Sequence, residues 1–464
     1  MRTMFTLQRI EQATGGEWLI PPMPDTPVRG VADDSRAIEP GQMFVAIRGE
    51  FADGHRFLRE AAQAGAVAVC VDQVPDEATQ HFLRSSHCGV LQVDYGLAAY
   101  HALATSHRQS LTACTVIGLT GSAGKTSVKE MLAAICRAAF GPYAVLATEG
   151  NTNNHFGVPR NLLRLTERHR CAIIELGSNQ PGDIAQLTQM VQPDVAVVTN
   201  IGRAHLEKLG SIEGVAKEKA DIVRGLRADG TAVLPFAGTG DTILKRAAGK
   251  REMRTFGIED GADVRVAYAG WDGSGYRLTL SWGGSDVPVW WQLGGAHQAR
   301  NAAAAAAVGL VLDIPAEAIV RGLRAAELPE MRAAVERRNA VLWFNDAYNA
   351  NPDSMRAGLD LFAEIADTEA ARPLILVLGD MMELGECAPE AHREVLEHAR
   401  VRFPEAHLLA VGPQMKEAAD ASDVEAFETA DEAAQAVAKR LVPGAAVFLK
   451  GSRRMALEKI FNRS

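Results

Sequence analysis

The segment at residues 115–127, TVIGLTGSAGKTS, constrains the fold more than any other part of the chain. Its first six residues are an apolar run typical of a buried strand; a turn with Gly121 and Gly124 follows, and a helix is expected from about Thr126. Glycines in such a turn let backbone N–H groups surround phosphate oxygens, and the helix N-terminus adds partial positive charge. The pattern predicts a nucleotide site, with Lys125 on the β- and γ-phosphates and the Thr126 hydroxyl on Mg²⁺.

This turn departs from the general phosphate-binding loop at one position. The general loop has a glycine where this chain has Leu119, and here Gly118 lies one position earlier, which gives the variant form GxTGxxGKT. An ordinary strand-to-helix turn is the alternative, but the flanking strand and helix favour a phosphate site. The residues expected to bind the nucleotide are Thr120, Gly121, Ser122, Ala123, Gly124, Lys125, Thr126 and Ser127.

The length of 464 residues predicts about three domains, at roughly 100–200 residues per domain. We place them at 1–108, 109–326 and 327–464. The first alternates short apolar runs with helical stretches. Its expected strands lie at 41–49 and 67–72, and its expected helices at 55–66 and 97–110.

The middle segment continues the series of strands and helices, with further apolar strands at 171–176 and 195–201. Such a series predicts an α/β fold with a doubly wound parallel sheet. Residues 262–293 instead place Tyr, Trp, Val and Thr at alternating positions between glycine turns, which predicts a small antiparallel β insertion. A helix is expected at 301–315.

The third segment contains four apolar runs, most of them followed by helical stretches, which predicts a second open, Rossmann-like α/β sheet. Ligands of such sheets bind beyond the C-terminal ends of the strands, so polar residues at those ends are the candidates for function. The four runs lie at 341–347, 372–380, 406–412 and 445–451.

Charge and hydropathy exclude several classes of protein. Lys and Arg number 48 against 57 Asp and Glu, a net charge of −9, and no long basic run is present, so we expect no nucleic-acid partner. The longest strongly apolar run, 302–312, is too short for a bilayer, which needs about 20 residues, and the N-terminus does not resemble a secretory signal. The six cysteines are widely spaced and form no CxxC pair, so we expect reduced thiols. We also expect a cytoplasmic, monomeric protein without stable membrane insertion.

Polar residues at strand ends in the middle segment are candidates for chemistry. Glu175 ends an apolar strand, where a carboxylate could reach a metal or cap a helix, and His205 could be a metal ligand or a structural residue. On the helix expected after Ser211, Lys217 and Lys219 are two residues apart and so face different directions. Glu213 lies four residues before Lys217, which suits an exposed ion pair, and this leaves Lys219 as the unexplained one.

The loop TEGNTNNHFG at 148–157 is rich in amide and hydroxyl groups. Such a loop could hydrogen-bond a polar substrate, or it could be a simple cluster of turns.

Taken together, these segments resemble the Mur ligases of peptidoglycan synthesis, a family of ATP-dependent amide-bond formers. The resemblance runs through almost the whole chain. NDAYNANPDSM and LGDMMELGE are most typical of the branch that adds D-alanyl-D-alanine, and the DNPR motif of the diaminopimelate-adding branch is absent. The matching segments are ADDSRAIEPGQMFVAIRGEFADGHRF, TGSAGKTS, TEGNTNNHFGVP, AIIELGS, TNIGRAHLE, GAHQARNAAAA, NDAYNANPDSM, LGDMMELGE and LKGSR.

The resemblance implies a domain that binds a UDP-linked substrate, a central ATPase and a C-terminal Rossmann-like domain that closes over the site. It implies that the C-terminal carboxylate of UDP-N-acetylmuramoyl-tripeptide attacks the γ-phosphate of ATP to give an acyl phosphate and ADP. The amine of D-alanyl-D-alanine then attacks the acyl carbon, and phosphate leaves. ATP is needed because a carboxylate has no leaving group, and catalysis is mainly positioning and charge neutralisation.

The resemblance also implies roles at the nucleotide. Thr126, Glu175 and His205 correspond to residues at two Mg²⁺ sites, and Lys219 corresponds to a lysine that many family members carry as a CO₂-derived carbamate. Asn301 resembles a residue that contacts adenine, and Asp346 one placed at the ribose or the closing domain. Arg332 resembles an arginine that reaches the phosphates, although Met331 stands where the family has glycine.

Further residues match positions at the substrates. Ser35 and Arg36, with Asp53, Gly54 and His55, resemble the UDP site. Thr148, Asn151, Asn153 and Asn154 resemble the loop that holds the muramoyl end, and Tyr348, Asn349 and Asn351 the residues that recognise the dipeptide. Lys450, Ser452 and Arg453 lie at a strand end, where they could meet a carboxylate or form a solvated basic tail.

Two alternatives to this interpretation are a related ligase and, from another class, a protein without catalysis. A related ligase of the folate polyglutamate or cyanophycin type would use another acceptor, but the DDSR and DGH segments argue against it. A catalytically silent nucleotide-binding scaffold is disfavoured because Lys125, Thr126, Glu175 and His205 are all present.

Overall fold

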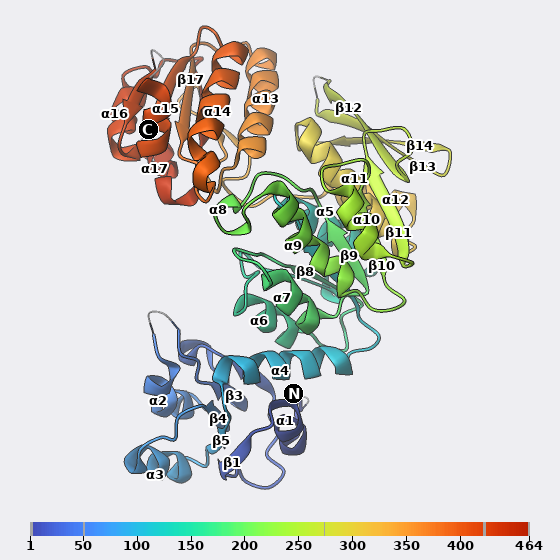
Figure 1. Ribbon diagram of the computed structural model, residues 1–464, viewed down its shortest axis with the longest axis vertical. Coiled ribbons are helices and arrows are strands. Elements are labelled where there is room, and N and C mark those ends of the chain that lie inside the picture. The colour runs from blue at the N-terminus through green and yellow to red at the C-terminus, as the bar shows by residue number, and fades with distance from the viewer. Residues whose placement is uncertain (1–2, 50–51, 273, 421–423, 463–464) are drawn as a thin grey trace. The chain divides into compact units, whose positions relative to one another are not determined.

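The computed structural model describes residues 3–49, 52–272, 274–420 and 424–462. Its contacts divide the chain into two compact units. The first consists of Met1–Val116, Leu146–Leu176 and Gln186–Gln192, and the second of Ile117–Val145, Gly177–Ala185 and Pro193–Ser464. Figure 1 shows the elements in chain order, from blue at the N-terminus to red at the C-terminus.

The first unit contains a five-stranded sheet in the order β1-β5-β4-β3-β2. β1 pairs antiparallel with β5, and the other neighbours are parallel. Apolar side chains of the strands and of α2 form its core. Its elements are α1 (Leu7–Thr14), β1 (Glu17–Ile20), β2 (Gly30–Ala32), β3 (Gln42–Val45), α2 (Leu58–Gln63), β4 (Ala68–Val71), α3 (Glu77–Ser85), β5 (Gly89–Gln92) and α4 (Gly96–Ser110), with 3-10 turns at Ser35–Ala37 and Gly54–Phe57.

Helix α4 packs within the first unit. Its last turn is buried: the His107 ring bonds the carbonyl oxygen of Leu165 at 2.8 Å, and the Arg108 side chain donates to the carbonyl oxygen of Val191 at 3.1 Å. It packs against α6. The other elements here are β7 (Val145–Ala147), α6 (Gly157–Leu163), β8 (Cys171–Glu175) and α7 (Asp183–Val191), the first and last of which extend into the second unit.

The second unit begins with a sheet whose strands follow the order β14-β13-β12-β11-β10-β9-β6. The strands from β6 to β11 are parallel, as predicted, and β12, from the segment expected to be antiparallel, also pairs parallel with β11. The antiparallel strands expected at 262–293 are present, and β12 joins them directly to the parallel sheet. The strands are β6 (Thr115–Thr120), β9 (Val195–Val198), β10 (Thr231–Pro235), β11 (Glu252–Gly257), β12 (Val264–Trp271), β13 (Tyr276–Trp282) and β14 (Ser285–Trp291).

Close helix packing supports this sheet. Gly322 approaches the backbone of Ile135 so closely that a Cβ atom would overlap it, and the alanines of α11 from Ala302 to Ala307 are fully buried. Helix α11 begins five residues earlier than expected, directly after Gly295. The helices are α5 (Lys125–Phe140), α8 (Leu206–Leu209), α9 (Ile212–Arg224), α10 (Asp241–Ala248), α11 (Ala296–Val311) and α12 (Ala316–Arg324), with a 3-10 turn at Pro142–Ala144.

The C-terminal part of the second unit is a six-stranded sheet in the order β15-β16-β20-β17-β18-β19. It is parallel except for β15, which pairs antiparallel with β16. The four predicted strands are β16, β17, β18 and β20, whereas β15 and β19 were not expected. The strands are β15 (Ala334–Arg338), β16 (Val341–Asn345), β17 (Leu374–Gly379), β18 (His407–Val411), β19 (Glu425–Phe427) and β20 (Ala446–Lys450).

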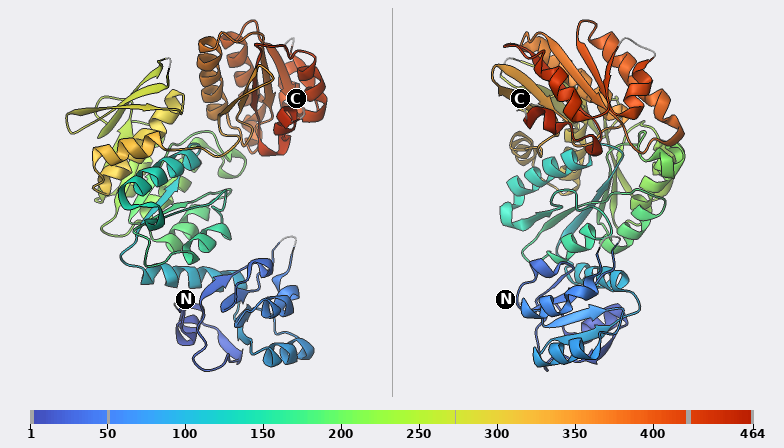
Figure 2. Two further views of the ribbon diagram at one scale, coloured as in Figure 1. Left: turned by 180° about the vertical axis from the view of Figure 1, so that it is seen from behind. Right: turned by 90° about the vertical axis from the view of Figure 1, so that its left-hand side faces the viewer.

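Helices cover both faces of this sheet, as Figure 2 shows. Side chains of α16 and α17 pack on one face against Trp343 and Val447. On the other, Phe362 of α13 contacts Phe344 and Phe448 of the strands. The helices are α13 (Pro352–Thr368), α14 (Ala388–Arg402), α15 (Pro413–Asp420), α16 (Ala430–Ala438) and α17 (Glu458–Asn462), with 3-10 turns at Gly385–Cys387 and Arg453–Met455. The chain is thus an α/β protein, as predicted, and its described residues form three sheets.

Candidate active site

The turn between β6 and α5 has the geometry of a phosphate-binding loop. Gly121 and Gly124 have φ angles of +154° and +78°. A Cβ atom on Gly121 would overlap the hydroxyl of Thr199, and one on Gly124 would lie 2.5 Å from Asn301 Oδ1. Lys125 begins α5, and its Nζ donates to the carbonyl oxygen of Gly121 at 2.7 Å. The glycines are therefore required by packing as well as by φ, and the loop ends at a helix N-terminus.

A second loop, residues 199–202 after β9, supports the first. Asn200 Oδ1 accepts a hydrogen bond from the backbone N–H of Ala123 at 2.8 Å. The Ser122 hydroxyl exchanges hydrogen bonds with the backbone of Gly202, at 3.1 Å to its oxygen and 3.0 Å from its nitrogen. These contacts hold the loop through protein groups alone. The other predicted nucleotide residues of this segment are buried: Thr120, Thr126 and Ser127.

Lys219, on α9, is fully buried. Its Nζ donates to the Ser178 hydroxyl at 2.6 Å. Burial, assisted by the positive charge of Lys125, lowers the pKa of Lys219 from 10.5 to about 7, although Glu218 and Asp183 act in the opposite direction. Near neutral pH, much of this amine is therefore uncharged and nucleophilic.

The two lysines of α9 differ as predicted. Lys217 is exposed and forms an ion pair with Glu213 at 2.7 Å. Glu218, between the two lysines, is buried, and its carboxylate accepts from the backbone N–H groups of Gly182 and Ile184 at 2.7 and 2.8 Å. Glu218 thereby fixes the segment that contains the start of α7.

His205 precedes α8 with a left-handed backbone, φ 54°. Its Nδ1 lies 2.5 Å from Oε2 of Glu383, which comes from the loop after β17. The imidazole lowers the pKa of the Glu383 carboxyl. The backbone also joins the two loops, because the N–H of Glu207 donates to the carbonyl oxygen of Glu383 at 3.1 Å. A carboxylate on Nδ1 fixes the ring and leaves Nε2 for another partner.

Asp346 and Lys450, at the ends of neighbouring strands β16 and β20, form an ion pair of 2.5 Å. The Lys450 side chain is 3% exposed, and it also donates to the carbonyl oxygen of Asn349 at 3.0 Å. Lys450 therefore meets a carboxylate, and Ser452 is also buried, whereas Arg453 lies at the surface and pairs with Glu458. The other oxygen of Asp346 accepts from the N–H of Ala333 at 3.1 Å.

Arg332 lies over the ring of Tyr348, 4.2 Å from its centroid. Met331 before it has a left-handed φ of 59°, a conformation that glycine would adopt more easily. Asn351 caps α13 through the N–H of Ser354, and its Nδ2 lies 3.5 Å from the carbonyl oxygen of Ser122. The dipeptide candidates thus contact both Arg332 and the phosphate-binding loop.

In the first unit, Glu175 lies buried at the end of β8. Its Oε1 accepts from Nδ2 of Asn153 at 2.9 Å, and its backbone N–H donates to the Thr148 hydroxyl at 3.0 Å. Asn153 also donates to Asn151, and Asn154 Oδ1 accepts from the N–H of Gly157 at the start of α6. The amide-rich loop is therefore built around Glu175.

The UDP candidates form two turns of the same unit. The Ser35 hydroxyl bonds Glu60 at 3.3 Å, while Arg36 is exposed and pairs with Asp34 at 2.8 Å. Asp53 accepts from the backbone of His55, and its Oδ1 lies 2.7 Å from His55 Nδ1.

Gly54 between them is required because a Cβ atom would lie 2.7 Å from the backbone nitrogen of Ile47. The second turn therefore lies close against the chain that follows β3.

The structure therefore groups the candidates within each unit. The nucleotide loop, Asn301, Lys219, His205 and the C-terminal residues belong to the second unit, and the UDP and muramoyl candidates with Glu175 to the first. Sequence reasoning missed Ser178 and Glu383, although both lie in segments that carry the family resemblance. The position of Ser178, three residues beyond the strand-end Glu175, was the available signal.

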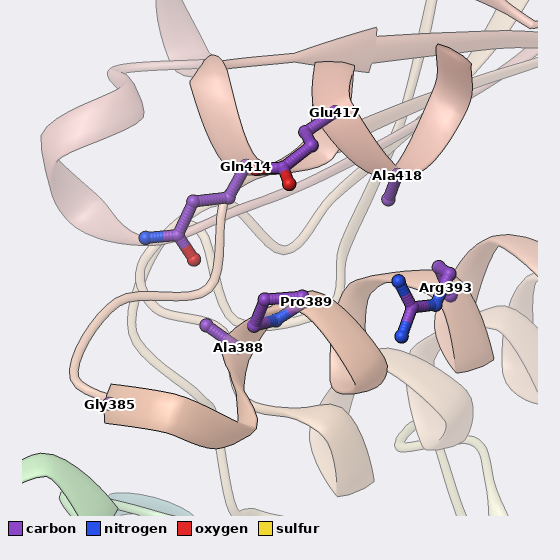
Figure 3. A pocket seen from close by; sticks show the side chains of 7 residues that line it. All are labelled: Gly385, Ala388, Pro389, Arg393, Gln414, Glu417 and Ala418. Atoms are coloured by element: carbon purple, nitrogen blue, oxygen red, sulfur yellow. The ribbon is translucent and has the colours of Figure 1, made fainter. Parts of the chain in front are cut away.

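A cavity of about 270 Å³ lies between α14 and α15 (Figure 3). Arg393, Gln414 and Glu417 supply its polar lining, with Gly385, Ala388, Pro389 and Ala418. None of the predicted site residues lines it. Within the described ranges, no group of three or more His, Cys, Asp and Glu could by itself hold a metal. No helix among those residues is long and apolar enough to cross a membrane.

Three family models match the chain. They are the Mur ligase family catalytic domain at residues 27–94, the Mur ligase middle domain at 119–309, and the Mur ligase glutamate ligase domain at 330–453. The matches follow one another along the chain and include the phosphate-binding loop.

Curated relatives and solved structures agree with these models. The UDP-N-acetylmuramoyl-tripeptide–D-alanyl-D-alanine ligase of Bacillus subtilis is 35% identical over 84% of this chain and 81% of its own. A crystal structure of MurF from Acinetobacter baumannii has 31% identity and a TM-score of 0.89, covering 99% of this chain and 98% of that one. MurF ligase from Thermotoga maritima in complex with ADP has 25% identity and a TM-score of 0.81, covering 95% and 98%. This chain belongs to the Mur ligase family.

Proposed function

We propose that this protein is an ATP-dependent amide ligase that joins D-alanyl-D-alanine to the C-terminal carboxylate of UDP-N-acetylmuramoyl-tripeptide. The observation that carries the proposal is the packed phosphate-binding loop at 121–126, in a chain that resembles ligases of this name along almost its whole length. The products are UDP-N-acetylmuramoyl-pentapeptide, ADP and phosphate. A reaction that consumes ATP and a UDP-linked precursor fits the cytoplasm.

The reaction has two steps. An oxygen of the tripeptide carboxylate attacks the γ-phosphorus of ATP, ADP leaves, and an acyl phosphate forms. The amine of D-alanyl-D-alanine then attacks the acyl carbon, the carbon–oxygen bond breaks, and phosphate leaves with that oxygen. The loop amides and Lys125 neutralise the phosphates, because two anions must be held together before the first bond forms.

We propose that Asn301 and Asp346 contact the nucleoside of ATP and that Arg332 contacts its phosphates. The packing of Asn301 against Gly124 supports the first assignment.

The residues present suit Mg²⁺. Thr126 and Glu175 offer hard oxygen donors, and the contact with Glu383 orients His205 so that Nε2 is available as a ligand. Mg²⁺ is usually held by one or two protein groups together with substrate phosphates, so the proposed sites depend on bound ATP. When bound, Mg²⁺ would neutralise charge on the phosphates.

Lys219 suits modification by CO₂. An uncharged amine adds to CO₂ to give a carbamate and a proton, and the lowered pKa of Lys219 provides that amine near pH 7. The carbamate is an anion that would offer oxygen donors to Mg²⁺.

The modification is tested with ¹³C-labelled bicarbonate. We expect an NMR carbamate signal in the wild type and in Lys217→Ala, and its loss in Lys219→Ala. A signal that persists in Lys219→Ala would refute the assignment.

The substrate assignments extend to the first unit. We propose the turns at 35–36 and 53–55 for the uridine end and the loop at 148–154 for the muramoyl end of the donor. The dense hydrogen bonds around Asn153 support the second assignment, because they hold amide groups at one place. Tyr348, Asn349 and Asn351 are proposed for the incoming dipeptide.

Phosphate release tests the function. Release should require ATP, the UDP-linked tripeptide and D-alanyl-D-alanine together, and glutamate in place of the dipeptide should give no product. Release at the full rate with ATP alone, or a product with glutamate, would contradict the proposal. The Lys125→Ala variant tests the alternative of a nucleotide-binding scaffold without catalysis. The proposed ligase predicts that this variant loses turnover.

A further inference from the structure

Three side chains from separate elements of the first unit meet at one point. Arg160 of α6 forms a two-pronged ion pair with Asp33, which follows β2: Nη2 lies 2.8 Å from Oδ2, and Nε lies 3.1 Å from Oδ1. The Tyr100 hydroxyl of α4 donates to the same Oδ1 at 3.4 Å. We name this group the Asp33–Arg160 clamp.

The clamp differs from an ordinary surface ion pair. The Asp33 side chain is only 8% exposed, whereas that of Arg160 is 49% exposed, so a buried carboxylate is paired with one half-exposed guanidinium. Planar two-pronged geometry fixes both direction and distance, and a lysine cannot reproduce it. Burial and the Asp33 charge raise the pKa of Tyr100, which therefore remains a neutral donor.

Each side of the clamp is adjacent to one proposed substrate segment. Asp33 directly precedes Asp34, Ser35 and Arg36 of the uridine turn. Arg160 lies on the helix that follows the amide-rich loop. The next residue, Asn161, holds that loop, because its Nδ2 donates to the carbonyl oxygen and the hydroxyl of Thr152 at 2.9 and 3.0 Å.

We propose that the Asp33–Arg160 clamp sets the spacing between the uridine turn and the muramoyl loop, so that both ends of the UDP-linked donor are held at once; this rests on the proposed function. Arg160 and Asp33 are positioning residues that need not touch the substrate. A ligand that spans both segments depends on their spacing, because its second contact is made at an effective concentration set by geometry. A ligand that touches only the uridine turn does not.

The proposal is tested by comparing the binding of UDP, which reaches only the uridine turn, with that of UDP-N-acetylmuramoyl-tripeptide, which spans both segments. Measured by calorimetry, the affinity of Arg160→Ala for UDP-N-acetylmuramoyl-tripeptide should fall by on the order of tenfold. Its affinity for UDP alone should change by less than about twofold. Arg160→Lys should recover part of the loss. The matched control is Arg59→Ala, in the same unit, because the guanidinium of Arg59 donates to the Thr79 hydroxyl and lies over the ring of Phe82, both on α3; this variant should bind both ligands like the wild type.

The outcomes are distinct. If Arg160→Ala loses affinity for UDP and for UDP-N-acetylmuramoyl-tripeptide to the same extent, the clamp does not set the spacing. The same conclusion follows if neither affinity changes. In steady state, the KM for the donor should rise while the KM for ATP stays unchanged, and a rise in both would also contradict it. Arg160→Gln provides a second variant if Arg160→Ala unfolds. A wild type that binds UDP but never turns over the donor would instead refute the proposed function.

Discussion

The buried amine of Lys219 predicts an unusual dependence of stability on pH. Its pKa is lowered from 10.5 to about 7, whereas the unfolded chain keeps the ordinary value. Between these values the unfolded state binds more protons than the folded state, so Lys219 makes the free energy of unfolding rise with pH. The penalty is greatest below pH 7 and disappears above pH 10.5.

The size of the effect follows from the two pKa values. A full proton difference changes the free energy of unfolding by about 1.4 kcal/mol per pH unit. Because about half of Lys219 is still protonated at pH 7 in the folded state, the gain between pH 7 and pH 9 is about 2 kcal/mol. Lys219→Met keeps an unbranched side chain of nearly the same length and removes its charge, so this gain should be lost in the variant.

Urea unfolding followed by tryptophan fluorescence measures the difference. Wild type and Lys219→Met are compared at pH 7 and 9 in CO₂-free buffer, and equal slopes against urea make the midpoints comparable. Lys217→Met is the matched control, because Lys217 is exposed and should leave the wild-type dependence unchanged. If the free energy of unfolding rises equally between pH 7 and pH 9 in the wild type and in Lys219→Met, the claim that this amine loses its proton in the folded state is refuted.

Two further predictions concern the loops. Gly121→Ala should abolish ATP binding measured by calorimetry and lower the Tm, because the new Cβ overlaps the Thr199 hydroxyl; wild-type affinity for ATP would contradict the packing argument. Glu383→Gln should raise the Mg²⁺ concentration needed for half-maximal turnover by about tenfold or more, because the carboxylate no longer fixes His205. An unchanged Mg²⁺ titration would show that Glu383 does not orient this ring.

Local patterns predicted much of the fold. The strand at 115–120 has the predicted bounds, and helix α4 differs from its prediction by one residue. The exposed ion pair of Lys217 with Glu213 followed from helical spacing, and so did the different direction of Lys219, whose burial the structure adds. These features depend on neighbours in sequence, which a single chain reveals.

Features that depend on distant partners were not predicted. Strand β15 carries Glu336 and Arg337 at exposed positions, so no apolar run marks it, and it exists because β16 pairs with it. Ser178 meets Lys219 across 41 positions of sequence, and the partner of His205 comes from a separate sheet. Contacts between residues that are distant in sequence cannot be inferred from local spacing.

The most direct test of the central claim follows one oxygen atom. The tripeptide carboxylate is labelled with ¹⁸O, and the released phosphate is analysed by mass spectrometry after a single turnover with ATP and D-alanyl-D-alanine. An acyl phosphate intermediate predicts that one ¹⁸O atom appears in the phosphate, because the carboxylate oxygen that attacked phosphorus leaves with it. Phosphate without the label would contradict the account.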